Sequence, residues 1–138
     1  GNHRGVTPFR IAENLDRLAD RALAGVTLLR QNGRQSKEFR QTVADIEAIG
    51  HLGRYYADKV RGSTELALYR ATNAQERQQQ AVASLESAVA HWEQYATAAS
   101  AQYRPQLLAR TRVNDLWKIL EDVRQDVVIA RDNILPQK

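Results

Sequence analysis

Glu47 and His51 are the residues best spaced to bind a metal ion, because they stand four positions apart. On a helix this spacing puts a carboxylate and an imidazole on one face, where both could ligate one ion. Metal centres in helical bundles need a Glu-x-x-His motif from each of two helices, and the sequence contains no such motif. We therefore interpret the two residues as an exposed side-chain pair, and we predict no metal site and no cofactor.

Motifs for nucleophilic catalysis are absent from the sequence. It has no Cys, no Gly-x-Ser-x-Gly, no His-Glu-x-x-His and no glycine-rich phosphate loop before a helix. Adjacent acids such as Glu121 and Asp122 point about 100° apart on a helix, so they cannot flank one bond. We predict no catalytic residue and no enzyme activity for the chain itself.

Tyr55, Lys59 and Arg61 belong to the densest cluster of aromatic and charged residues. Tyr56 shares an apolar stripe with Val60, so we place Tyr56 in the core with its hydroxyl at the edge. Tyr55 is turned about 100° away, which favours the surface and makes it a candidate contact with a partner. Packing within the fold is the alternative role for this cluster.

Tyr103, Arg104 and Arg110 form a second candidate contact, in a stretch from 95 to 113 that holds no acid. Arginine beside an aromatic ring suits a carboxylate, a phosphate or a protein surface, and loops on a rigid scaffold often carry function. The alternative is that these arginines bind helix carbonyls or acids of neighbouring helices.

The overall charge and hydropathy exclude two classes of partner. The net charge of +4 comes from 20 basic and 16 acidic residues that are interspersed, whereas a nucleic-acid binder carries a basic stripe. No apolar run approaches the roughly 18 residues of a membrane span. We therefore predict neither nucleic-acid binding nor a membrane span.

Four amphipathic helices are predicted, over about 8–32, 37–72, 75–103 and 115–134, because apolar residues recur there at steps of three and four. The first apolar stripe holds Ile11, Leu15, Leu18, Ala22, Val26 and Leu29. The second holds Phe39, Val43, Ile46, Ile49, Tyr56, Val60 and Leu66. The third holds Val82, Leu85, Val89, Trp92, Ala96 and Ala99. The fourth holds Val113, Leu116, Leu120, Val123, Val127, Ala130 and Ile134.

Capping signals mark the helix starts, at Thr7 with Pro8, at Ser36, at Asn73 with Glu76, and at Asn114 or Asp115. Each glycine within the second helix costs up to about 1 kcal/mol relative to Ala, which close helix packing or a kink would offset. These glycines are Gly50, Gly53 and Gly62.

The expected fold is all-α, a four-helix antiparallel up-down-up-down bundle with one longer connection between the third and fourth helices. We expect no strand, and we expect Trp92 and Trp117 in the core or at its edge. A helical-repeat solenoid is the alternative. Residues 1–138 form one domain, and the absence of Met together with a start at Gly1 indicates a piece of a larger protein.

Four segments, 55–62, 65–70, 88–95 and 103–111, carry a resemblance to a known family. Over roughly the last two-thirds, the chain resembles the helical region that follows the catalytic domain in some bacterial glycoside hydrolases, of the alpha-glucuronidase-like and hexosaminidase-like kind. Residues 112–115 depart from that region, which has a glycine-aromatic turn there.

The resemblance implies a noncatalytic accessory module of a periplasmic or secreted carbohydrate-active enzyme. The partners would be the upstream catalytic domain of the same polypeptide and, in a homodimer, a second copy. Such a module would leave an apolar surface uncovered. The alternative is a stand-alone interaction or sensor bundle, with a polar surface all round or a self-complementary dimer face. An enzyme would instead need a deep pocket with perturbed titratable groups.

Overall fold

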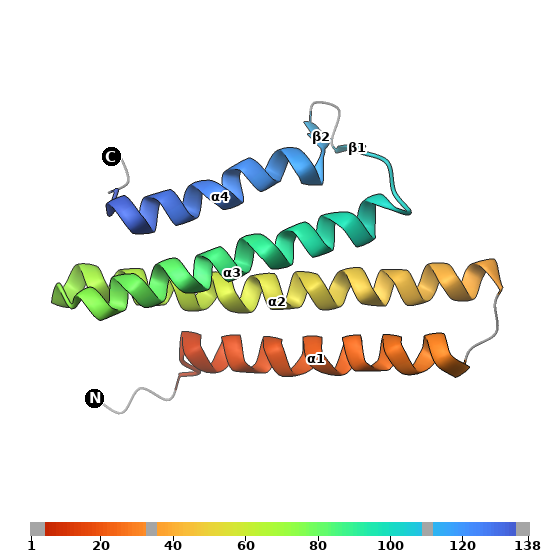
Figure 1. Cartoon of the computed structure of the whole chain (residues 1–138), viewed down its shortest axis with the longest axis horizontal. Coiled ribbons are helices and arrows are strands. Elements are labelled where there is room, and N and C mark those ends of the chain that lie inside the picture. Colours follow the sequence, from red (N-terminus) through yellow and green to blue (C-terminus); the bar gives the residue numbers. More distant parts are fainter. Residues whose placement is uncertain (1–4, 33–35, 109–111, 135–138) are drawn as a thin grey trace.

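Four helices dominate the structure, a computed structural model that describes residues 5–32, 36–108 and 112–134. They are α1 (Pro8–Asn32), α2 (Lys37–Thr72), α3 (Gln75–Ser100) and α4 (Leu116–Asp132). Figure 1 shows them side by side in chain order, each running opposite to the one before it. The prediction of an all-α fold with four helices is confirmed. In the described part of the chain, no helix is long and apolar enough to cross a membrane.

Side-chain caps begin three of the helices where the sequence predicts them. Thr7 Oγ1 accepts from the backbone N–H of Arg10, and Ser36 Oγ accepts from that of Phe39. Asp115 caps α4 by accepting from the N–H groups of residues 117 and 118. Each oxygen satisfies a donor that has no partner within its helix.

The prediction that Asn73 caps the start of the third helix is wrong. Asn73 ends α2 instead of starting α3, because its φ of 57° is left-handed and its N–H donates to the carbonyl of Tyr69. Asn tolerates this conformation better than most residues, and one left-handed residue reverses the chain after a helix. Ala74 therefore occupies the cap position of α3 and provides no side-chain hydrogen bond.

The connection between α3 and α4 contains two short strands that were not predicted. Strands β1 (Gln106–Leu108) and β2 (Arg112–Asn114) pair antiparallel, with Leu107 opposite Val113. Three residues are too few for an alternating pattern to show, so periodicity could not reveal them. The third helix also ends at Ser100, three residues before the predicted end.

Close contacts at glycines join α2 to the helices on either side. A Cβ at Gly50 would lie 2.8 Å from Leu23 of α1, and one at Gly62 would lie 2.6 Å from Cγ of Leu85 in α3. Such distances are shorter than any real contact, so only glycine allows this approach. Close packing explains why the 36-residue helix retains these residues.

Two faces of α2 are buried, since α2 lies between α1 and α3. Residues spaced by seven, at Val43, Gly50 and Ala57, are buried on the side of α1, while Tyr55 and Leu66 are buried against α3 and α4. The single apolar stripe predicted for α2 coincides with neither of these two buried faces. Consequently Tyr56 and Ile49, which were predicted to be core residues, are 49% and 65% exposed.

The main core is shared by α2, α3 and α4. One cluster joins Tyr55 to Trp92 and Leu120, and a second joins Leu66 to Leu85 and Val127. The indole of Trp92 also donates to the carbonyl of residue 116 over 2.8 Å. The core prediction is confirmed for Trp92 but wrong for Trp117, which is 47% exposed.

Helix α1 lies outside this core. Among the described residues its extensive contacts are with α2 alone, and Figure 1 shows it on the far side of α2 from α4. Its buried residues are Ala12, Ala19 and Val26. Half of its predicted apolar stripe is exposed, and the exposed fractions of Ile11 and Leu18 are 44% and 58%.

Candidate interaction surface

One side of the α1–α2 hairpin is held by ion pairs. Arg54 pairs with Asp20 at 2.8 Å, Arg30 pairs with Glu47 at 2.6 Å, and Arg61 pairs with Asp16. In each pair one residue belongs to α1 and the other to α2. On this side, the charged groups of the two helices are therefore matched to each other.

The opposite side of the hairpin is apolar and exposed. We call it the apolar face and define it by four residues of α1 and three of α2, which are Ile11, Leu15, Leu18, Leu29, Ile49, Tyr56 and Val60. Leu15 and Val60 are partly buried, and the other five are at least 38% exposed. Contiguous exposed apolar surface on a protein usually marks a binding site.

Gly53 shows that the apolar residues of the two helices form one surface. A Cβ built there would lie 3.2 Å from the Cβ of Ala19 and 3.9 Å from the carbonyl oxygen of Leu15. Ile49 and Tyr56 lie one helical turn on either side of Gly53, on the same face of α2. Leu18 follows Leu15 on α1, so no polar strip separates the two sets.

The outer edge of α1, beyond the apolar face, is basic. At about 100° per residue, Arg10, Arg17 and Arg21 lie roughly 60° to 100° around the helix from Leu18, away from α2. All three arginines are exposed, and none forms an ion pair within the part of the chain that the structure describes. Glu13 is the acid that accompanies them on this edge.

The corresponding edge of α4 carries two acids, Asp122 and Asp126, with one base, Lys118, a turn before them. Asp126 of α4 pairs with Lys59 of α2 at 2.8 Å, which places this side of α4 beside α2. Asp122 lies one turn earlier on the same side, and Glu121 and Asp132 lie further around the helix. Asp122, Glu121 and Asp132 are exposed and form no ion pair among the described residues, and Asp122 is the one that shares the side of Asp126.

Tyr55 and Lys59, both predicted as contact residues, serve the interior of the fold. Tyr55 is 4% exposed and packs edge-on against Trp92, so its predicted surface position is wrong. Lys59 Nζ donates to the Tyr55 hydroxyl over 3.1 Å. Partial burial acts to lower the pKa of Lys59, but hydrogen bonds to Asp126 and Tyr55 outweigh it and leave the pKa raised.

Arg61, the third residue of that cluster, joins three helices. It pairs with Asp16 of α1 and Asp58 of α2, and Asp58 accepts a hydrogen bond of 2.6 Å from Ser87 of α3. Partial burial acts to lower the pKa of Arg61, while the two carboxylates outweigh it and raise the pKa. His91 lies 3.5 Å from Asp58. Because the Ser87 hydroxyl donates to a carboxylate and not to His91, the group lacks the arrangement that activates a serine.

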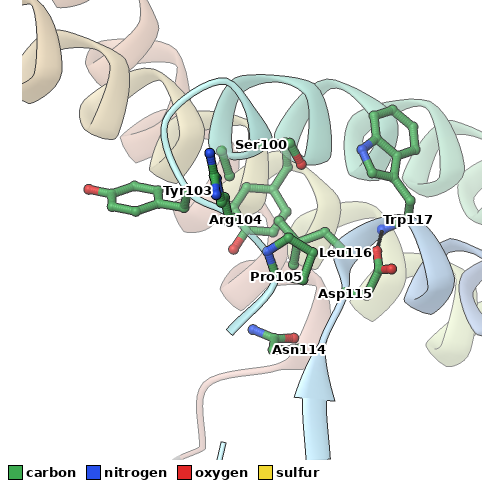
Figure 2. Close-up of a pocket in the computed structure, with 10 residues that line it drawn as sticks. Ser100, Tyr103, Arg104, Pro105, Asn114, Asp115, Leu116 and Trp117 are labelled. Carbon is green, nitrogen blue, oxygen red and sulfur yellow. Dashed lines mark hydrogen bonds between the residues drawn. The ribbon is translucent and has the colours of Figure 1, made fainter. Parts of the chain in front are cut away.

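Tyr103 and Arg104 lie at the other end of the molecule, where α3 ends. The Tyr103 hydroxyl donates to Asp45 of α2 over 2.8 Å, and this hydrogen bond raises the pKa of Tyr103. Tyr103 and Arg104 belong to the lining of a pocket, and Figure 2 shows the Tyr103 ring extending away from the other labelled lining residues. The pocket has a volume of about 550 Å³ and also includes Tyr95 and Trp117. The carboxylate in this pocket is that of Asp115, and it accepts the hydrogen bonds that cap α4.

The other residues singled out in the sequence, Arg110, Glu47 and His51, do not form one site with the residues described above. Arg110 lies outside the described residues. Glu47 and His51 are both partly buried, and Glu47 binds Arg30. The His51 Nδ1 atom is buried without a hydrogen-bond partner, and burial lowers the pKa of His51. Among the described residues, no group of three or more His, Asp or Glu is arranged to hold a metal ion.

The apolar face was missed because its residues were all assigned to the core. Its signal was nevertheless in the sequence, since α1 carries Ala12, Ala19 and Val26 at a spacing of seven beside the larger residues Ile11 and Leu18. Small residues allow helices to approach closely, so the small stripe of α1 faces α2 and the large stripe does not. No family model, curated protein or solved structure matches the chain.

Proposed function

We propose that the chain is a noncatalytic helical module that binds another protein surface through the apolar face. The observation that carries the proposal is the contrast between the two sides of the α1–α2 hairpin. Charged residues are paired on one side, whereas large apolar residues such as Leu18 and Ile49 are left 58% and 65% exposed on the other.

Burial of this face would release a substantial free energy. Covering apolar surface contributes about 25 cal/mol per Å², so a few hundred Å² corresponds to several kcal/mol. The structure offers no internal element for this purpose among the described residues, since α3 and α4 pack on other faces of α2. A polar surface all round, which the sequence allowed for a stand-alone bundle, is not what the hairpin presents.

The resemblance noted in the sequence specifies a partner for the module. On that basis we propose a periplasmic or secreted carbohydrate-active enzyme of a bacterium, in which the module packs against the preceding catalytic domain or holds two copies together. The alternative is a stand-alone interaction or sensor bundle, which would use the same face without an attached catalytic domain.

Site-specific photocrosslinking in cells that express the whole polypeptide tests this proposal. A benzophenone side chain replaces Leu18 or Ile49 on the apolar face, and the matched control replaces Ala83, which is exposed on α3 far from that face. The expected result is an adduct with one defined protein surface at both face positions and none at the control, identified by mass spectrometry.

The identity of the crosslinked peptide separates the alternatives. Peptides from a catalytic domain in the same polypeptide would support the accessory module, and peptides from any other protein would support the stand-alone bundle. Peptides from a second copy of this chain would be consistent with a homodimer, whether the chain is an accessory module or a stand-alone bundle. The absence of any adduct at positions 18 and 49, or equal adducts at position 83, would refute binding through the apolar face.

A further inference from the structure

We infer that the apolar face binds a second copy of this chain, in a symmetric dimer whose two-fold axis runs parallel to the helices. In this arrangement α1 of each copy lies on α4 of the other. The inference rests on the proposed function and names the partner of the same surface. Three features carry it: the charges of the two edges, the heights of those charges along the helices, and the size of the face.

The two edges that border the apolar face carry opposite charges. The α1 edge carries Arg10, Arg17 and Arg21 without ion-pair partners among the described residues, and the α4 edge carries Asp122 in the same state. Because α1 and α4 lie on opposite sides of α2, these charges cannot meet in one molecule. A second copy can bring them together.

Symmetry allows only one of two simple arrangements to match the charges. If the two-fold axis ran across the helices in the plane of the face, α1 would lie on α1 and arginine would face arginine. If the axis runs parallel to the helices, α1 lies on the partner's α4, and Arg17 of each copy faces Asp122 of the other. Like charges placed opposite each other disfavour the first arrangement, so complementarity selects the second.

Arg17 and Asp122 also stand at the same height along the molecule. Gly53 meets Ala19, and α1 runs opposite to α2, so Arg17 is level with residue 55 of α2. Lys59 meets Asp126, and α4 runs in the same direction as α2, so Asp122 is level with residue 55 too. Rotation about an axis parallel to the helices preserves height, which places Arg17 against the partner's Asp122.

The face is large enough for a stable dimer. Helix α1 has 25 residues, which at 1.5 Å each gives a length of about 37 Å. Two helices about 10 Å apart give the face a width of roughly 20 Å, and thus a projected area of roughly 700 Å². A standard interface buries about 800 Å² on each partner, so the α1–α2 hairpin with the α4 edge meets that requirement.

Crosslinking of single-cysteine variants tests the arrangement directly, because the chain contains no Cys. Arg17→Cys and Asp122→Cys are prepared separately, mixed, and treated with a short bismaleimide. The expected result is a covalent dimer joining the two variants, at least about fivefold more abundant than the dimer formed by Arg17→Cys alone, since only the mixed pair is adjacent. Equal yields, or no covalent dimer from the mixture, would overturn the arrangement.

Sedimentation of the purified chain tests the dimer itself. The wild type is expected to be dimeric, Leu18→Asp with Ile49→Asp monomeric, and the control Ala83→Asp dimeric. The reversal Arg17→Glu is expected to weaken association about tenfold, and adding Asp122→Arg to the same chain should restore it. Circular dichroism establishes that each variant remains helical.

The outcomes separate this inference from the proposed function. A wild type that remains monomeric at several hundred micromolar overturns the dimer, yet photoadducts of positions 18 and 49 with a different protein would leave the interaction function standing. If the chain is monomeric and those positions form no adduct, both fail. A dimer that persists when Leu18 and Ile49 are both replaced by Asp would refute the apolar face as its interface.

Discussion

Gly62 is the position at which the close packing of α2 on α3 can be tested most directly, by the substitution Gly62→Ala. The new Cβ would lie 2.6 Å from Cγ and 2.9 Å from Cδ2 of Leu85, and 3.1 Å from the backbone oxygen of Ala81. Cγ of Leu85 is close to the backbone and cannot swing away as the end of a long side chain can. The helices must therefore separate locally, or Leu85 must leave its favoured rotamer.

Two opposing terms set the size of the effect. Replacing glycine by alanine within a helix contributes about 1 kcal/mol of stability, because glycine loses more conformational freedom on folding. Forcing an extra methyl group into a packed core costs about 1–3 kcal/mol. The sum predicts that Gly62→Ala lowers the free energy of unfolding by about 1 kcal/mol, within a range from near 0 to about 2.

Gly25 supplies the matched control within the same fold. It lies inside α1, and a Cβ built there meets no atom within 4 Å. Gly25→Ala is therefore expected to raise the free energy of unfolding by about 0.5–1 kcal/mol. Urea unfolding followed by far-ultraviolet circular dichroism, at low micromolar concentration so that association does not contribute, measures both values. A Gly62→Ala variant as stable as Gly25→Ala would refute the packing described here.

The other predictions concern individual hydrogen bonds and titrating groups. The raised pKa of Lys59 contributes stability that is complete below about pH 10.5 and is lost as the pH rises through the folded-state pKa, so the gap between wild type and Lys59→Met should shrink there. The lowered pKa of His51 contributes stability present above about pH 6.5 and lost as the pH falls, and urea unfolding of His51→Leu should show a weaker loss in acid. Asp45→Asn should bring the pKa of Tyr103 back toward 10.0, as measured by ultraviolet titration of the phenol. Asp115→Ala removes the cap of α4 and should lower the free energy of unfolding by about 1 kcal/mol.

The helices themselves could be predicted from the sequence because their signals are local. The spacing of apolar residues and the caps at Thr7 and Ser36 place α1 and α2 at the predicted boundaries. Asn73 was misassigned because an Asn can stop one helix as readily as it can start the next, and only the left-handed φ decides between these roles. The strands β1 and β2 left no periodic signal, being three residues each.

The candidate site could not be predicted in the same way, because exposure depends on how many neighbours a helix has. A helix with one neighbour buries one stripe, and the single predicted stripe of α2 corresponds to that case. With α1 and α3 on two sides, Tyr55 becomes buried and Tyr56 exposed. The spacing of seven marks Ala12, Ala19 and Val26 as a second stripe of α1, but whether α1 buries this stripe or that of Leu18 depends on the fit at Gly53 and Gly50 of α2.

The position of α1 at the margin of the fold has a consequence for its dynamics. Within the described part of the chain its extensive contacts are with α2 alone, through a few small side chains and exposed ion pairs, so its opening requires less free energy than unfolding of the α2–α4 core. Its backbone amides should then exchange hydrogen with solvent earlier than those of α3. Coverage of the apolar face would give α1 a second neighbour, and in a dimer that exchange would slow as the protein concentration rises. The helix that holds the surface for binding would thus be the helix that binding orders.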